Sequence, residues 1–189
     1  LGIGALDFRD VERLSIKIGG QVHGFDAEAH FDRQKLGLYD RFTQFTLIAA
    51  REAVAQSGLT FSDELAETSG VVLGTAAGGM NTWDDNFRSV YEEGKNRVHP
   101  FVVPKLMTNA ATSHVPIEFN LHGPSLTVSS ACTSSNLSIG LAFQMLRSVM
   151  ARTFIARCPE SMQTFGAIKA SDVLQLISKT AYLPPSANR

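Results

Sequence analysis

One cysteine has neighbours of the types and spacing that nucleophilic chemistry needs. Cys132 lies within G-P-S-L-T-V-S-S-A-C-T-S-S-N (residues 123–136), after a β-prone run at Leu126–Val128 and before apolar residues at helical spacing from Leu137. The pattern predicts a buried strand, a tight turn of small residues that carries the thiol, and then a helix. Small neighbours let a substrate carbonyl approach, and the positive end of a helix favours thiolate over thiol. The residues alone leave two interpretations open, a nucleophile or a small buried apolar side chain.

Two further strands are expected to position this turn. Gly70–Leu73 is a continuous apolar run, typical of a strand covered on both faces, and Thr153–Ala156 is a second short apolar run. The first run ends in G-T-A-A-G-G, Gly74–Gly79. Because no G-K-[ST] follows these glycines, we interpret them as a flexible turn beside a site rather than as a phosphate loop.

Helical patterns alternate with these strands. Asp40 is expected to cap a helix that ends at Gly58 and carries one apolar face. Further helices are expected at 62–66, 81–93, 104–119, 137–150 and 165–177, with Pro116 kinking or shortening the third of them. His114 lies near an apolar face, and we interpret it as a structural histidine rather than a general base. The alternation predicts an α/β fold with a largely parallel sheet.

Composition narrows the class of protein. The chain has 189 residues, 44% hydrophobic and 19% charged, with a net charge of −1. These values are typical of a globular protein and indicate neither a nucleic-acid nor a membrane partner. The low cysteine content, two residues, predicts no disulfide and favours a cytoplasmic setting. The five histidines are scattered along the chain and predict no metal site. The chain begins L-G-I-G-A-L and ends S-A-N-R, which we interpret as an excised fragment.

The segment around Cys132 resembles the nucleophile segment of the β-ketoacyl-[acyl-carrier-protein] synthases, most closely the type II enzymes of bacterial fatty-acid synthesis. The resemblance covers most of the chain. Its other motifs fall in the family's order: F-D-A-E-A-H-F-D at 25–32, Y-D-R-F-T-Q-F at 39–45, G-V-V-L-G-T-A-A-G-G at 70–79, V-P-K-L-M-T-N-A-A-T-S-H at 103–114 and S-A-N-R at 186–189.

The resemblance implies a thiolase-like fold, layered αβαβα in its whole form, of which residues 1–189 would be the N-terminal domain, incomplete at both ends. It implies that Cys132 accepts an acyl chain from acyl carrier protein as a thioester, and that its N–H stabilises the oxyanion. Malonyl-carrier protein would then lose carbon dioxide and attack the acyl-enzyme. The resemblance also implies no cofactor, Leu106 and Met107 in the acyl pocket, and a homodimer that pairs through strand 125–130.

Departures from the family keep alternatives open. The family's two histidines and lysine lie beyond Arg189, so full activity of these residues alone is not expected. Arg157, Cys158 and Pro159 stand where the family has glycines and a hydroxyl residue, and we interpret Cys158 as an accidental or structural thiol. A non-catalytic chain-length-factor subunit is disfavoured by Cys132. A polyketide ketosynthase would tend to read T-A-C-S-S-S, and an α/β thiol hydrolase lacks a convincing base and orienting partner.

Overall fold

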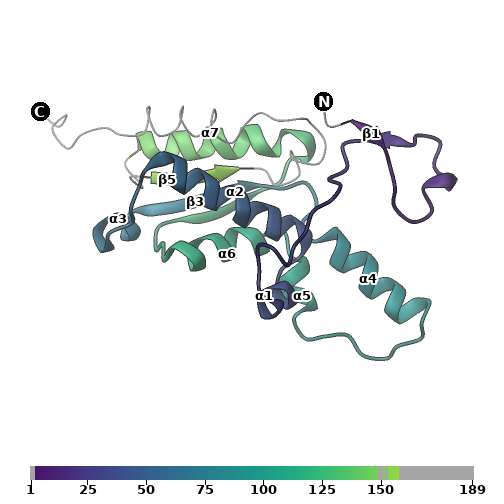
Figure 1. Cartoon of the computed structure of the whole chain (residues 1–189). Coiled ribbons are helices and arrows are strands. Elements are labelled where there is room, and N and C mark those ends of the chain that lie inside the picture. The colour runs from purple at the N-terminus through teal and green to yellow at the C-terminus, as the bar shows by residue number, and fades with distance from the viewer. Residues whose placement is uncertain (1–2, 149–150, 152, 158–189) are drawn as a thin grey trace, which may run out of the picture.

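The computed structural model describes residues 3–148, 151 and 153–157, which fold around a three-stranded sheet (Figure 1). Strand β3 (Ser69–Gly74) lies between β4 (Ser125–Val128) and β5 (Thr153–Arg157). Both pairings are parallel; Leu73 lies opposite Thr127 of β4 and Arg157 of β5. The predicted strands at 70–73 and 153–156 and the predicted parallel sheet are therefore confirmed.

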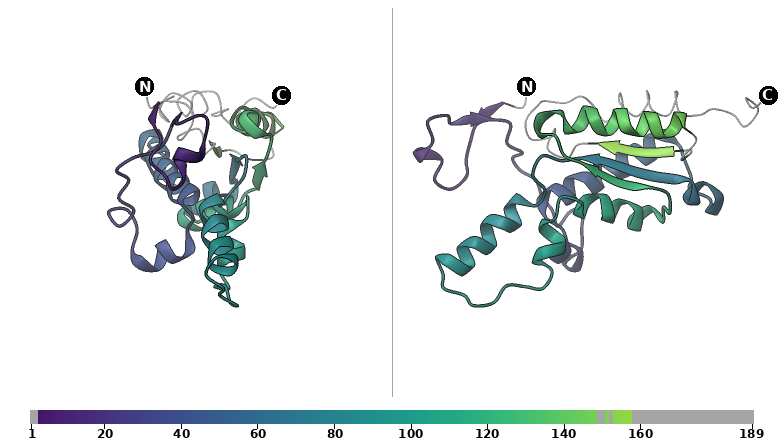
Figure 2. Two further views of the ribbon diagram at one scale, coloured as in Figure 1. Left: turned by 90° about the vertical axis from the view of Figure 1, so that its right-hand side faces the viewer. Right: turned by 180° about the vertical axis from the view of Figure 1, so that it is seen from behind.

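Helices cover both faces of β3, and all six of its residues are buried. Val72 packs with Ala142 and Met145 of α7 (Ser134–Arg147) on one face. Val71 and Leu73 pack on the other face, in the core formed with α2 (Arg41–Ser57) and α6 (Ala110–Phe119). The right-hand view of Figure 2 shows α7 above the strands and α6 below them. A strand that is buried on both faces needs the uninterrupted apolar run that the sequence contains.

Helix α2 is bounded by the residues that the sequence indicated. The Asp40 side chain accepts a hydrogen bond from the Phe42 N–H, and Gly58 ends the helix at φ 66°, a left-handed conformation that suits glycine. A short helix, α3 (Asp63–Glu67), follows, and the Ser62 side chain caps it. The predicted ends of α2 at Asp40 and Gly58 are confirmed, and α3 begins one residue after the predicted start at Ser62.

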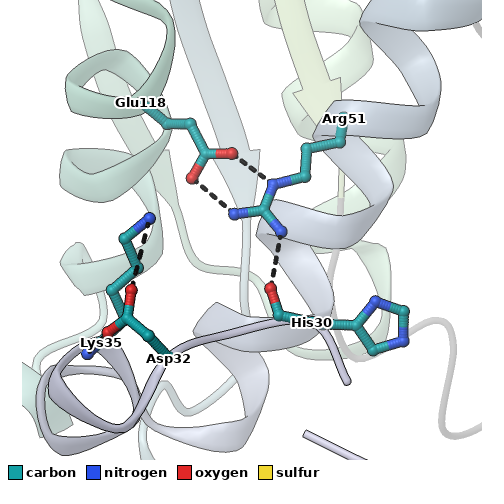
Figure 3. Close-up of polar contacts among 5 residues, drawn as sticks. All are labelled: His30, Asp32, Lys35, Arg51 and Glu118. Atoms are coloured by element: carbon teal, nitrogen blue, oxygen red, sulfur yellow. Dashed lines mark hydrogen bonds and ion pairs between the residues drawn. The ribbon is translucent and has the colours of Figure 1, made fainter. Parts of the chain in front are cut away.

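An ion pair joins α2 to α6 (Figure 3). Arg51 binds Glu118 with two hydrogen bonds, one from Nε to Oε1 and one from Nη2 to Oε2 at 2.9 Å. Arg51 Nη1 also donates to the His30 carbonyl at 3.3 Å, and the guanidinium lies 4.7 Å from the Phe31 ring centroid. The hydrogen bond to Glu118 is the main cause that raises the pKa of Arg51. Nearby, Asp32 caps α1 (Arg33–Leu38) and lies 4.0 Å from Lys35 Nζ.

The predicted single helix over 104–119 is wrong. The segment forms α5 (Val102–Leu106) and α6, because Met107 has ψ 144° and interrupts the helical backbone between them. Pro116 lies inside α6 and does not end it. Helix α6 continues past Pro116 to Phe119, and Asn120 ends it at φ 52°.

The remaining described elements lie outside the central layers. The first part of the chain pairs β1 (Gly4–Ala5) antiparallel with β2 (Ile18–Gly19) and contains a short 3₁₀ turn, η1 (Val11–Arg13). Helix α4 (Met80–Tyr91) confirms the helix predicted at 81–93. Cys158, Pro159 and the predicted helix at 165–177 lie outside the described residues. In the described part, no helix has the length and apolar character needed to cross a membrane.

Candidate nucleophile site

Cys132 lies in a single 3₁₀ turn, η2 (Ala131–Thr133), which joins the end of β4 to the start of α7. The thiol is free and exposed. The predicted order of strand, turn and helix is therefore confirmed. The prediction that the strand is buried is wrong, because β4 lies at the edge of the sheet that the described residues form, and Leu126 is 41% exposed.

Hydroxyl side chains hold the turn that presents the thiol. Ser134 is fully buried; its Oγ accepts from the Ser130 N–H at 2.8 Å and donates to the Ala131 carbonyl at 2.8 Å. Thr133 Oγ1 donates to the Ser130 carbonyl at 2.7 Å. Ala131 has φ 44°, a conformation that costs an L-residue about 1–2 kcal/mol. The serines and threonine around Cys132 thus stabilise a strained backbone immediately before the thiol.

The end of β3 contacts this turn so closely that only glycine fits. A Cβ on Gly74 would lie 2.2 Å from the carbonyl oxygen of Ser134, at the start of α7. The next residue, Thr75, donates its N–H to the Val128 carbonyl at the end of β4, at 3.0 Å. The loop that begins at Gly74 is therefore packed against the turn that carries Cys132. Carboxyl ends of parallel strands are where α/β proteins commonly bind ligands.

The other end of the same loop contacts α5. The Gly79 N–H donates to the Leu106 carbonyl at 3.0 Å, and a Cβ on Gly79 would lie 2.7 Å from Leu106 Cα. Leu106 is half-buried, whereas Met107 is 42% exposed. The six-residue loop 74–79, which we call the glycine loop, thus links the predicted acyl-pocket residues to the turn that carries Cys132. We call that turn, residues 130–134, the thiol turn. The prediction of a turn beside the site agrees with this placement.

Sequence reasoning missed the long-range role of Asp40. Its Oδ2 accepts from the Thr82 N–H at 2.7 Å and from Thr82 Oγ1 at 2.6 Å, next to the end of the glycine loop. The sequence identified Asp40 only as the cap of α2. No local pattern could have found a partner 42 residues away.

His114 lies in the core side of α6 rather than at the thiol turn. Its ring packs edge-to-face on Tyr39 with centroids 4.6 Å apart. Burial lowers the pKa of His114 and raises that of Tyr39. This packing agrees with the structural interpretation of His114. Among the described residues, no group of three histidine, cysteine or acidic side chains is placed to hold a metal ion.

These features define a class of protein: an α/β protein whose parallel sheet presents an exposed thiol at a strained strand-to-helix turn. The chain belongs to the β-ketoacyl synthase family, because residues 5–187 match the family described as "Beta-ketoacyl synthase, N-terminal domain". The resemblance seen in the sequence motifs is therefore confirmed.

Curated relatives agree with this assignment. Over 177 residues the chain is 33% identical to 3-oxoacyl-[acyl-carrier-protein] synthase 2 of Staphylococcus aureus (strain N315). The aligned region covers 94% of this chain and 43% of the relative. It is also 33% identical over 162 residues to nodulation protein E of Rhizobium leguminosarum bv. trifolii, covering 86% of this chain and 40% of that protein. The chain thus spans less than half the length of these relatives.

Solved structures confirm the α/β thiolase-like fold. A β-ketoacyl synthase from Burkholderia phymatum STM815 has a TM-score of 0.68 at 20% identity, covering 82% of this chain and 38% of that chain. The ketosynthase of the AntDE:AntF complex with its type II polyketide acyl carrier protein has a TM-score of 0.67 at 19% identity, covering 85% of this chain and 45% of that chain. At these identities the likeness concerns the fold alone.

Proposed function

We propose that this chain supplies the acyl-accepting part of a β-ketoacyl-[acyl-carrier-protein] synthase of fatty-acid synthesis, with Cys132 as the nucleophile. The observation that carries the proposal is the exposed, free thiol in a strained turn at the start of α7. Family membership and the name of the Staphylococcus aureus relative support the reaction class.

The proposed step is a thioester exchange. The Cys132 sulfur attacks the carbonyl carbon of an acyl-carrier thioester, the carbon–sulfur bond to the carrier breaks, and the carrier thiol leaves with the proton that Cys132 loses. Covalent capture divides one difficult carbon–carbon bond formation into two easier steps. The Cys132 N–H, at the start of the helical segment, is proposed as one donor to the oxyanion. No cofactor is needed for this exchange.

The acyl chain is proposed to lie along Leu106 and Met107. The glycine loop supports this placement, because it contacts Leu106 at one end and the thiol turn at the other. Residues 1–189 are proposed to act as one N-terminal ketosynthase domain. Because no residue here matches the family's decarboxylating histidines and lysine, we expect acyl transfer without condensation when these residues act alone.

Two partners belong to this proposal. Acyl carrier protein is the proposed donor, since the carrier is in the Staphylococcus aureus relative's name and a structurally similar ketosynthase was solved in complex with one. A second copy of the chain is proposed to pair with β4, the edge strand with an exposed Leu126. A cytoplasmic setting, expected from the cysteine content, completes the proposal.

Mass spectrometry of the intact chain tests the proposed acyl transfer. Incubation with an acyl carrier protein that bears an acyl thioester should add one acyl group to the chain. Peptide analysis should map this group to Cys132. The Cys132→Ser variant should gain no thioester, whereas Cys158→Ser should be acylated like the wild type. Acylation of Cys158 instead, or no acylation of the folded chain, would refute the assignment.

The main alternative, a non-catalytic chain-length-factor subunit, predicts a different outcome. One structurally similar protein is a ketosynthase/chain-length-factor pair, with a TM-score of 0.63 at 24% identity. Such a subunit would need no exposed thiol at the turn, so absence of acyl transfer together with tight binding to a catalytic ketosynthase would favour it.

A further inference from the structure

Asp40 is a buried carboxylate that joins α2 to α4. It is 3% exposed, and in the described part of the chain no basic side chain forms an ion pair with it. Its Oδ1 accepts from the Phe42 N–H at 3.2 Å, and its Oδ2 accepts the two hydrogen bonds from Thr82. Amides in the first turns of α2 and α4 therefore both donate to this one carboxylate.

Helix α4 depends on this remote cap because its own first residues provide none. Gly79 is the N-cap of α4 and has no side chain to accept a hydrogen bond from the helix. The Thr82 N–H is one of the first amides of α4, which lack partners within the helix, and Asp40 supplies its acceptor. The start of α4 is thus fixed by a residue on another helix.

The glycine loop ends where this cap begins. A Cβ on Gly79 would lie 3.2 Å from Asp40 Oδ2, so the carboxylate packs directly on the loop's last residue. At the first residue, Gly74 touches Ser134 of the thiol turn. Within the loop, the buried Thr75 hydroxyl accepts a hydrogen bond from the Gly78 N–H at 3.1 Å. Glycines at 74, 78 and 79 add no side chains of their own, so the contacts at the two ends of the loop also help to set its conformation.

We propose that Asp40 is a positioning residue that fixes the glycine loop, through Thr82 and Gly79, beside Cys132. The proposal rests on the proposed acyl transfer for its effect on activity. The Asp40 side chain contacts Phe42, Thr82 and Gly79, so in this proposal it acts on the thiol turn through the glycine loop. In this role Asp40 sets where an acyl thioester lies relative to the sulfur, and it does not alter the sulfur itself.

Asp40→Asn is the sharpest perturbation because it keeps the shape of the side chain. An amide has one acceptor oxygen where the carboxylate has two, so it cannot cap α2 and α4 at once. Thr82→Val is the partner variant, since it removes only the Oγ1 donor. Ser62→Ala is the matched control, because it removes the cap of α3 before the amino end of β3, opposite the glycine loop.

Hydrogen–deuterium exchange and Cys132 kinetics of the full chain test the proposal together. In Asp40→Asn, amides of residues 78–84 should exchange at least tenfold faster, while those of β3 change less than twofold. The acyl-pantetheine concentration that half-saturates Cys132 acylation should rise at least tenfold, while alkylation of Cys132 by iodoacetamide changes less than twofold. Thr82→Val should show a smaller rise, and Ser62→Ala should show neither change.

Three results would overturn the role of Asp40: unchanged exchange at 78–84, an unchanged half-saturating concentration, or an equal change in alkylation and acylation. An equal change would mean general loosening of the fold. If the wild-type chain is not acylated at all, the proposed function fails, and the exchange data alone still decide whether Asp40 holds the glycine loop.

Discussion

Replacing Gly74 by alanine is the most direct perturbation of the contact between β3 and the thiol turn. The added Cβ would lie 2.2 Å from the Ser134 carbonyl oxygen and 2.4 Å from its carbonyl carbon. Both atoms are backbone atoms at the start of α7, so no side chain can rotate away. We therefore expect either α7 or the end of β3 to move.

The size of the movement follows from the structure. Real Cβ contacts are essentially never shorter than 3.0 Å, so the separation from the Ser134 oxygen must increase by about 0.8 Å. Overpacking a core typically costs 1–3 kcal/mol, and a clash between two backbone segments belongs at the upper end, about 3 kcal/mol. Because Ser134 holds the Ser130–Ala131 backbone, the same movement should disturb Cys132.

Urea denaturation and iodoacetamide labelling measure these two effects. Gly74→Ala should lower the free energy of unfolding by about 3 kcal/mol and change the alkylation rate of Cys132 in the folded protein. Gly140→Ala is the control within α7, because its Cβ would meet nothing within 4 Å. An exposed helical glycine costs roughly 0.5–1 kcal/mol relative to alanine, so this variant should be more stable than the wild type. A Gly74→Ala protein as stable as the wild type would refute the close contact.

Three further predictions concern the turn, the core and the ion pair. Ala131→Gly should be at least as stable as the wild type, because glycine adopts φ 44° without the cost of about 1–2 kcal/mol that alanine carries; a clear loss in thermal denaturation would contradict the strain. Burial lowers the pKa of His114 below 6.5, so the unfolded chain binds a proton that the folded chain does not, and stability should fall as pH drops below 6.5. His114→Gln should flatten this fall in unfolding measured from pH 7 to 5, and an unchanged slope would exclude His114 as its source. Arg51→Lys should lower the free energy of unfolding by about 1 kcal/mol, because lysine cannot form the paired hydrogen bonds to Glu118. The loss is small because both side chains are partly exposed. A double-mutant cycle with Glu118→Gln that shows no coupling would contradict this prediction.

Local sequence patterns predicted the helix ends, the strand and the turn that neighbouring residues determine. The apolar run at Gly70–Leu73 can only be a strand covered on both faces or part of a buried helix, and glycines at both ends favour the strand. Asp40 and Gly58 marked the ends of α2 because capping depends on residues within one turn. The turn at Cys132 was predictable for the same reason.

Long-range geometry accounts for what the sequence did not reveal. Nothing near Asp40 in the chain identifies Thr82 as its second partner, and nothing near Gly74 identifies Ser134 as its neighbour. The exposure of Leu126 depends on β4 being the edge strand, which the residues of β4 alone do not determine. Met107 interrupted a continuous helical pattern because the backbone there turns to meet the glycine loop, whose end contacts Leu106.

Protection of one thiol by an acyl donor tests the central claim most directly. The chain is incubated with acylated carrier protein and then treated with iodoacetamide near neutral pH. The alkylation rates of Cys132 and Cys158 are measured by mass spectrometry. We predict that Cys132 reacts faster than Cys158 without donor, is protected at least tenfold by the donor, and recovers after hydroxylamine cleaves the thioester. Equal alkylation of the two cysteines in the folded chain, unaffected by the donor, would contradict the account.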